Sequence, residues 1–191
     1  MKTVDNKKFI GLDLDGVIIN HAPVKIELAK KFGFKLKPEE TPSEIMRRII
    51  DEATYKEIQF NLYDNPKFFK TAPLMAGAKS GLKKLKDSSL PFALISRRKD
   101  SKSAIAVLKY HGLWPKFFDV SNTFFVVEPA DKNVKAQELG VTHFADDEFK
   151  ILEKLANVKN KFLFDNLDAF ENIHGYTRVE SWKELIGYFM K

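Results

Sequence analysis

The sequence predicts an α/β fold in which helices cover both faces of a parallel sheet. The main evidence is a strict alternation of short apolar runs and helical patterns from about residue 76 onward. Residues 17–75 interrupt this alternation, because they are helical in pattern and far longer than a crossover between parallel strands needs. We therefore expect a core made of residues 1–16 and 76–191, with a helical domain inserted at 17–75. The length of 191 residues suits this arrangement.

Five short apolar runs are the predicted strands. Each run is bounded by turn residues and is too short for an ordinary helix. Because helical segments connect them, we expect parallel strands whose carboxyl ends meet at one edge of the sheet. The runs cover residues 8–14, 92–95 (ending at Ser96), 123–127, 142–145 and 161–164.

Helical periodicity fills the segments between these runs. In the insertion we expect one helix over 23–32, which Gly33 ends, and a second that begins at Thr41-Pro42-Ser43-Glu44. That tetrapeptide predicts Thr41 as the N-cap and Pro42 at the first helical position. The core helices are expected at 76–86, 101–110, 132–139 and 148–155, with a last one opened by Ser181.

The composition excludes several classes of protein. The chain has no cysteine, which excludes disulfides, thiolate zinc sites, iron–sulfur clusters and cysteine nucleophiles. No stretch approaches the roughly 20 apolar residues of a membrane span, so we expect no membrane partner. Two aspartates interrupt the first apolar run, which is unlike a signal peptide and favours a cytoplasmic location. The formal charge is +6, and residues 79–102, which are rich in lysine, are interpreted mostly as a solvated face rather than a nucleic-acid site.

Polar side chains follow the ends of three predicted strands, and a lysine opens the helix after another. Ligands of an open parallel sheet bind outside these carboxyl ends, so we expect the groups to converge. Several carboxylates at close range need a cation, and Mg²⁺ fits because it prefers oxygen ligands and keeps room for a phosphate. A carboxylate can also attack phosphorus, so the set is typical of phosphoryl transfer. The groups are Asp13, Asp15, Ser96, Lys132, Asp146 and Asp147.

The segments that carry these groups resemble the motifs of the haloacid-dehalogenase-like (HAD) hydrolase superfamily. FIGLDLDGVI at 9–18 resembles the first motif, an apolar strand followed by Asp-x-Asp-Gly-Val. Leu-Ile-Ser at 94–96, Lys132 and Phe-Ala-Asp-Asp at 144–147 resemble the second, third and fourth motifs, in order. The resemblance implies a Rossmann-like three-layer core with a type 1 helical cap at 17–75. The short cap and the Asp-Gly-Val start also resemble deoxyribonucleotidase-like members.

The resemblance further implies roles for these residues. Asp13 would take the phosphoryl group as an aspartyl-phosphate and bind Mg²⁺. Asp15 would protonate the leaving group and then activate water, and its backbone carbonyl would also bind the metal. Ser96 would hydrogen-bond the phosphate, and Lys132 would neutralise charge on the phosphate and on Asp13.

Three assignments stay open at this point. Lys135 lies one helical turn from Lys132 and competes for the same role, although the expected helix start favours Lys132. Either Asp146 or Asp147 could bind the metal directly. Of the two arginines that follow Ser96, we assign Arg97 to the substrate phosphate and expect at least one to be solvated. Asn20 and His21, just after the first strand, could line the entrance beneath the cap.

We therefore predict a Mg²⁺-dependent phosphohydrolase, monomeric or homodimeric, that acts on a nucleoside monophosphate or a sugar phosphate. A phosphotransferase or phosphomutase with the same aspartyl-phosphate remains an alternative. A dehalogenase is disfavoured because it would not need Asp15, since no leaving-group oxygen takes a proton. A signalling receiver domain carries similar groups, but in a different chain order. The last alternative is a non-catalytic module that binds anions or nucleic acid through residues 79–102.

Overall fold

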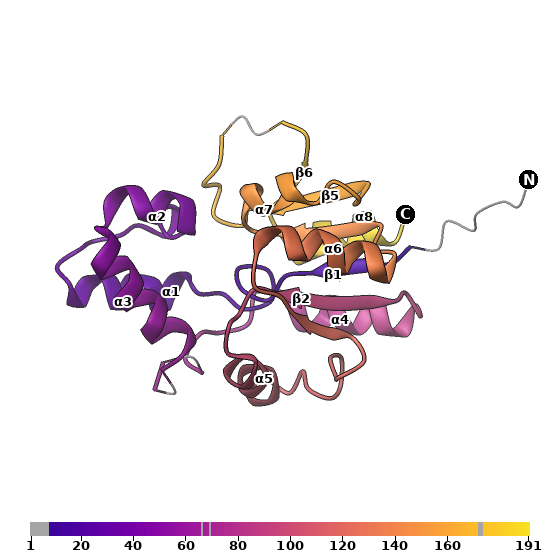
Figure 1. Cartoon of the computed structure of the whole chain (residues 1–191), viewed down its shortest axis with the longest axis horizontal. Coiled ribbons are helices and arrows are strands. Elements are labelled where there is room, and N and C mark those ends of the chain that lie inside the picture. The colour runs from indigo at the N-terminus through magenta and orange to yellow at the C-terminus, as the bar shows by residue number, and fades with distance from the viewer. Residues whose placement is uncertain (1–7, 66, 69, 172–173) are drawn as a thin grey trace, which may run out of the picture.

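The computed structural model describes residues 8–65, 67–68, 70–171 and 174–191. Their centre is a six-stranded sheet of order β3-β2-β1-β4-β5-β6, in which every neighbouring pair is parallel (Figure 1). This architecture confirms the predicted α/β fold class. The strands are β1 (Ile10–Leu12), β2 (Phe92–Ser96), β3 (Thr123–Phe125), β4 (His143–Asp146), β5 (Asn160–Phe164) and β6 (Thr177–Val179).

The edge strand β6 is absent from the sequence-based prediction, which gave five strands. It pairs with β5 in the register Phe162↔Thr177 to Phe164↔Val179, and only Val179 of its three residues is buried. A three-residue strand with two polar positions produces neither an apolar run nor a clear alternation. The first and third strands are also shorter than predicted, because the chain leaves the sheet after Leu12 and after Phe125.

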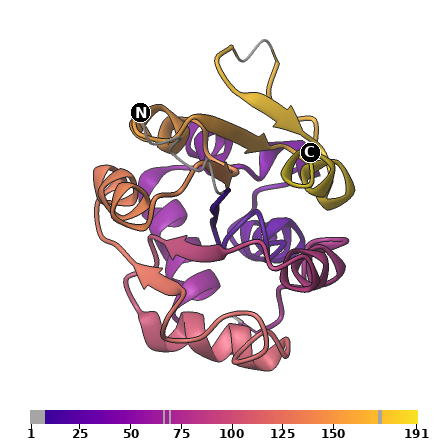
Figure 2. The ribbon, with the colours of Figure 1, turned by 90° about the vertical axis from the view of Figure 1, so that its right-hand side faces the viewer.

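Five helices flank the sheet and divide its core into two layers. Helices α4 (Ala78–Asp87) and α8 (Trp182–Phe189) cover one face, and α6 (Pro129–Leu139) and α7 (Phe149–Lys154) cover the other, as Figure 2 shows end-on. Helix α5 (Ser101–Tyr110) packs at the β2–β3 side. Within the strands, consecutive side chains alternate between the layers: Leu94 joins the α4–α8 layer and Ile95 joins the α6–α7 layer.

The segment between β1 and α4 is helical, as predicted, and lies beyond the carboxyl ends of the strands (Figure 1). It contains α1 (Ala22–Lys31), the short 3₁₀ helix η1 (Pro38–Glu40), α2 (Ser43–Ile49) and α3 (Glu52–Tyr63). The segment's entry and exit lie side by side, because Asn20 N donates to Pro73 O (2.8 Å) and Met75 N donates to Ile18 O (2.8 Å). Within the described residues, no helix combines the length and the apolar character that crossing a bilayer requires.

The predicted N-cap at Thr41 is wrong. Thr41 Oγ1 donates to Pro38 O (2.7 Å) and thereby closes η1, so α2 begins after Pro42 with no side-chain cap. The preceding 3₁₀ turn competes for the same hydroxyl, which the tetrapeptide pattern does not reveal. The other predicted start is confirmed, since Ser181 Oγ accepts from Glu184 N (3.3 Å) at the beginning of α8.

Candidate active site

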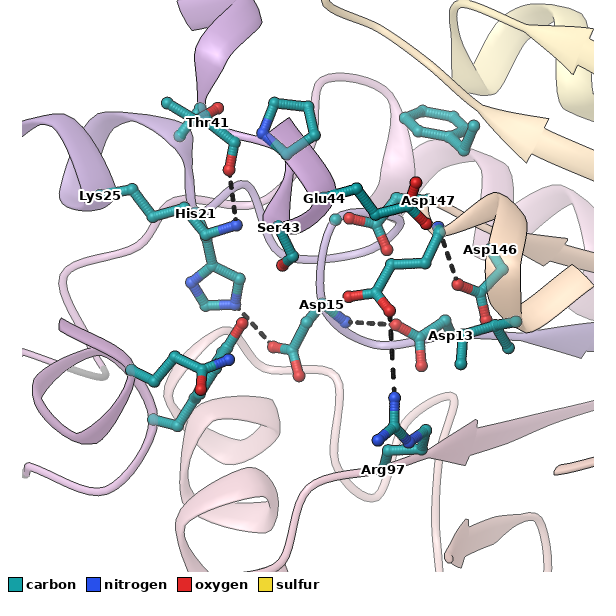
Figure 3. A pocket seen from close by; sticks show the side chains of 18 of the residues that line it. Asp13, Asp15, His21, Lys25, Thr41, Ser43, Glu44, Arg97, Asp146 and Asp147 are labelled. Atoms are coloured by element: carbon teal, nitrogen blue, oxygen red, sulfur yellow. Dashed lines mark hydrogen bonds and ion pairs between the residues drawn. The ribbon is translucent and has the colours of Figure 1, made fainter. Parts of the chain in front are cut away.

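The carboxyl ends of β1, β2 and β4 open into a cavity of about 760 Å³ between the sheet and the inserted helices. Six of the seven predicted site residues line it: Asp13, Asp15, Arg97, Lys132, Asp146 and Asp147. Ser96 is the exception. Its side chain is buried below the cavity wall, where Oγ accepts from Arg98 N (3.2 Å), because the chain after β2 turns back over it. Figure 3 shows Asp13, Asp146 and Asp147 on the sheet side and Lys25, Thr41 and Glu44 on the side of the insertion.

Lys132 joins the first and fourth strands at the base of the cavity. Its ammonium group donates to Asp13 Oδ1 (2.7 Å) and to Asp146 Oδ2 (2.7 Å), and all three side chains are buried. Helix α6 begins at Pro129 rather than at Lys132, so Lys132 points inward from the end of the first turn. Lys135 lies on a more exposed side of α6, where it pairs with Glu138. The structure therefore brings Lys132, and not Lys135, to the aspartates.

Burial controls the protonation of this cluster. Removal from water raises the pKa of Asp13 to about 7, although Lys132 opposes the shift. Burial alone would lower the pKa of Lys132, but Asp13 and Asp146 hold it above its usual range. Burial, together with Glu148, Asp146 and Asp13, also raises the pKa of Asp147 well above its usual value. The cluster thus contains more carboxylates than its one ammonium can neutralise.

Three carboxylates of the cluster fit a divalent cation. Asp13, Asp146 and Asp147 each offer one oxygen, and these oxygens lie within 4.8 Å of one another. Asp147 packs against Gly16, where a Cβ would lie 2.0 Å from Asp147 Oδ2, and Gly16 has a φ of +81°. Only glycine therefore leaves room for this carboxylate. An all-oxygen donor set is the one that Mg²⁺ prefers.

Arg98 is the functional candidate that the sequence-based assignment missed. Its side chain is buried and donates to the Asp15 carboxylate, whereas the Arg97 side chain is 37% exposed and lies 3.9 Å from Glu148 Oε2 on the cavity wall. Sequence alone could not separate the two arginines, because both follow the end of β2 and no strand periodicity fixes their directions.

His21 completes the surroundings of Asp15, with Nε2 2.6 Å from Asp15 Oδ1. Burial would raise the pKa of Asp15, but Arg98 and His21 outweigh it and hold that pKa well below its usual range. Asp15 is therefore a carboxylate in this arrangement. Asn20 and His21, which the sequence offered as candidates for the entrance beneath the insertion, both line the cavity.

The insertion supplies the opposite wall. Lys25 of α1 is buried and donates to Thr41 O (2.9 Å). Glu44 of α2 accepts from Lys150 N (3.3 Å) in the first turn of α7, so it connects the insertion to the helix after the Asp146-Asp147 pair. Phe60 of α3 lines the cavity with 54% of its surface exposed, which leaves an aromatic face open to a ligand.

Comparisons with known proteins identify a family for this chain. The family described as 5′ nucleotidase, deoxy (pyrimidine), cytosolic type C protein matches residues 7–190. No curated protein matches the sequence.

Solved structures show the same fold at low identity. A HAD hydrolase of family IA, variant 3, from Entamoeba histolytica is 19% identical with a TM-score of 0.63, covering 93% of this chain and 94% of that one. A predicted phosphatase from Clostridium acetobutylicum is 14% identical with a TM-score of 0.66, covering 96% of this chain and 98% of that one. The chain therefore belongs to the 5′ nucleotidase, deoxy (pyrimidine), cytosolic type C protein family and is a phosphatase of the HAD-like hydrolase superfamily.

Proposed function

We propose that the protein hydrolyses the 5′-phosphate of a nucleoside monophosphate, with Mg²⁺ and through an aspartyl-phosphate on Asp13. The observation that carries the proposal is the buried convergence of Asp13, Lys132, Asp146 and Asp147 at the strand ends. The family's description supports a pyrimidine deoxyribonucleotide as substrate. The same description includes the cytosol, and we infer that compartment for this chain.

Asp13 is the proposed nucleophile of the first step. A carboxylate oxygen of Asp13 attacks phosphorus, the bond between phosphorus and the ester oxygen breaks, and its electron pair stays on the leaving oxygen. Before this step the Asp15 carboxylate must separate from Arg98 and take up a proton. Asp15 then gives that proton to the leaving oxygen. Lys132 holds Asp13 in place from 2.7 Å and offsets negative charge as the phosphoryl group arrives.

In the second step a water oxygen attacks the phosphorus of the aspartyl-phosphate. The bond between phosphorus and Asp13 breaks, its electron pair returns to the Asp13 carboxylate, and Asp15 takes the proton of the water. Asp13, Asp146 and Asp147, with the carbonyl of Asp15, would hold Mg²⁺, which would supply positive charge to the phosphate and help to orient it. Arg97, which lines the cavity, would help to bind the phosphate, whereas Ser96 lies below the cavity wall and would act only through its hydrogen bond to Arg98 N.

We propose that residues 17–75 act as a cap that selects the leaving group. Phe60 and Tyr63 line the cavity from α3, and the exposed ring of Phe60 is a suitable contact for a nucleobase. Lys25 adds a buried amino group to the same wall. A nucleobase and sugar would thus lie between the inserted helices and the strand ends.

Phosphate release tests the proposal. The panel contains nucleoside 5′-monophosphates, sugar phosphates and p-nitrophenyl phosphate, each with Mg²⁺ and with EDTA. We expect Mg²⁺-dependent release that is highest for pyrimidine deoxyribonucleotides, disappears in Asp13→Asn and persists in Asp87→Asn, a change on the exposed end of α4. Equal release in EDTA, or a folded and fully active Asp13→Asn protein, would overturn the chemistry. Preference for a sugar phosphate would overturn only the substrate.

A further inference from the structure

Arg98 holds the Asp15 carboxylate from one side. Arg98 Nη2 donates to Asp15 Oδ1 (2.7 Å), and Nε lies 3.0 Å from Oδ2 and 3.2 Å from Oδ1. Two nitrogens of one planar guanidinium thus contact both oxygens, a geometry that fixes the rotation of a carboxylate as well as its place. Arg98 is buried, whereas the Asp15 side chain is 19% exposed and lines the cavity.

Arg98 is itself held from two directions. Its backbone N donates to Ser96 Oγ (3.2 Å), which anchors it to the end of β2. Its guanidinium lies over the ring of Tyr63 (4.8 Å to the centroid), and Nη1 donates to Tyr63 O (3.4 Å) at the end of α3. The side chain therefore bridges the sheet and the inserted helices, and its position at Asp15 is determined from both.

The direction of these contacts distinguishes Arg98 from a phosphate ligand. Lys132 contacts Asp13, the proposed nucleophile, whereas Arg98 directs both its Nε and its Nη2 at Asp15. A guanidinium used in this way orients the group that handles protons.

We propose that Arg98 is a positioning residue for the second step, which fixes the Asp15 carboxylate so that it takes the proton of the attacking water. The inference rests on the proposed function, since it assumes the aspartyl-phosphate on Asp13. In that step the water oxygen bonds to phosphorus, the bond to Asp13 breaks with its electron pair returning to Asp13, and the water proton moves to Asp15. Without Arg98 the Asp15 carboxylate turns away, and the aspartyl-phosphate persists.

p-Nitrophenyl phosphate separates the two steps. Its leaving group departs as a stable anion and needs no proton, so the first step does not depend on Asp15. In Arg98→Gln we expect kcat to fall about 10²-fold, the loss typical of a misplaced catalytic group, while kcat/KM stays within about threefold. We also expect a burst of about one p-nitrophenol per enzyme molecule, because the first step becomes faster than the second.

Three further proteins make the test specific. Arg98→Lys keeps the charge but loses the planar fork, so we expect kcat to recover in part. The double variant Arg98→Gln/Asp15→Asn should be no slower than Asp15→Asn alone, because Arg98 acts through Asp15. Lys102→Gln removes an exposed charge from the first turn of α5 and should match the wild type. Circular dichroism establishes that each protein is folded, and Arg98→Lys serves if the glutamine variant is not.

The outcomes separate the inference from the proposed function. If wild-type protein shows no Mg²⁺-dependent turnover of any substrate, the proposed function fails. If wild-type turnover is present but kcat/KM falls in parallel with kcat and no burst appears, Arg98 binds the phosphate or supports the fold, and the inference is wrong. An additional loss in the double variant would also overturn it.

Discussion

Lys132 and Asp13 form a buried ion pair with a separation of 2.7 Å, and the same ammonium lies 2.7 Å from Asp146. Asp13 directly follows β1 and Asp146 ends β4, so one side chain of α6 contacts carboxylates at the ends of two adjacent strands. Without a metal ion, Lys132 is the nearest positive charge that these buried carboxylates contact. The stability of the fold and the proposed catalysis therefore depend on the same side chain.

Replacement of Lys132 by Met should destabilise the protein in EDTA by about 3–5 kcal/mol, because it leaves buried carboxylates without a counter-charge. Lys135→Met is the matched control on the same helix. Its pair with Glu138 is largely solvent-exposed, so the control should change the free energy of unfolding by less than about 1 kcal/mol. Urea unfolding measures both values, and similar midpoints for the two variants would contradict the role of the buried pair.

Asp13→Asn should reduce turnover by at least about 10⁴-fold, because it removes the proposed nucleophile while preserving the shape of the side chain. Steady-state phosphate release measures the loss, and circular dichroism checks the fold. Substantial turnover in the folded variant would show that another group attacks phosphorus.

The stability of Asp13→Asn relative to the wild type should depend on pH. The pKa of Asp13 is raised to about 7 in the folded protein, so the folded state keeps a proton that the unfolded chain loses near pH 4. This contribution is fully present below about pH 4 and is lost as pH rises through about 7. Asp13→Asn does not titrate at this position and should gain stability relative to the wild type between about pH 5 and pH 8 in EDTA. If the difference in unfolding free energy between Asp13→Asn and the wild type stays constant across this range, the raised pKa of Asp13 is contradicted.

Mg²⁺ should stabilise the wild-type protein more at pH 8 than at pH 6. Metal ligands must be deprotonated, and burial raises the pKa values of Asp13, Asp146 and Asp147. The increase in melting temperature on adding Mg²⁺ at each pH measures the effect. The opposite order would show that the cation binds elsewhere.

Gly16→Ala should weaken Mg²⁺ binding, because the new Cβ would lie 2.0 Å from Asp147 Oδ2 and displace that carboxylate. Gly140→Ala is the matched control, since Gly140 also has a positive φ (+70°) but a Cβ added there would have no neighbouring atom within 4 Å. Both variants should lose about 1–2 kcal/mol of stability through backbone strain. Only Gly16→Ala should lose Mg²⁺ affinity, which isothermal titration calorimetry measures. Equal affinities would place Asp147 outside the metal site.

The sequence predicted the strands that hold the candidate site residues better than it predicted the edge strand of the sheet and the starts of the helices. Asp13, Asp15, Asp146 and Asp147 follow strands whose apolar runs are long enough to be recognised, and parallel strands bring their ends together. The edge strand β6 and the cap of α2 were not predicted correctly. Both depend on contacts outside the local pattern. The preceding 3₁₀ turn takes the Thr41 hydroxyl, and pairing with β5 makes a strand of the short, largely polar segment β6.

The sequence by itself determined the fold class, the order of the strand-end carboxylates and the helical nature of residues 17–75, because these follow from local periodicity and from the geometry of parallel sheets. Only the tertiary structure decided that Lys132 rather than Lys135 reaches the aspartates, that Arg98 is buried against Asp15 while Arg97 stays on the cavity wall, and that Ser96 lies below that wall. The physical reason is that a side chain's direction beyond a strand end, or around a helix, is set by packing with residues distant in sequence. Tyr63 and Ser96 fix Arg98 in this way, and no local pattern records their contacts.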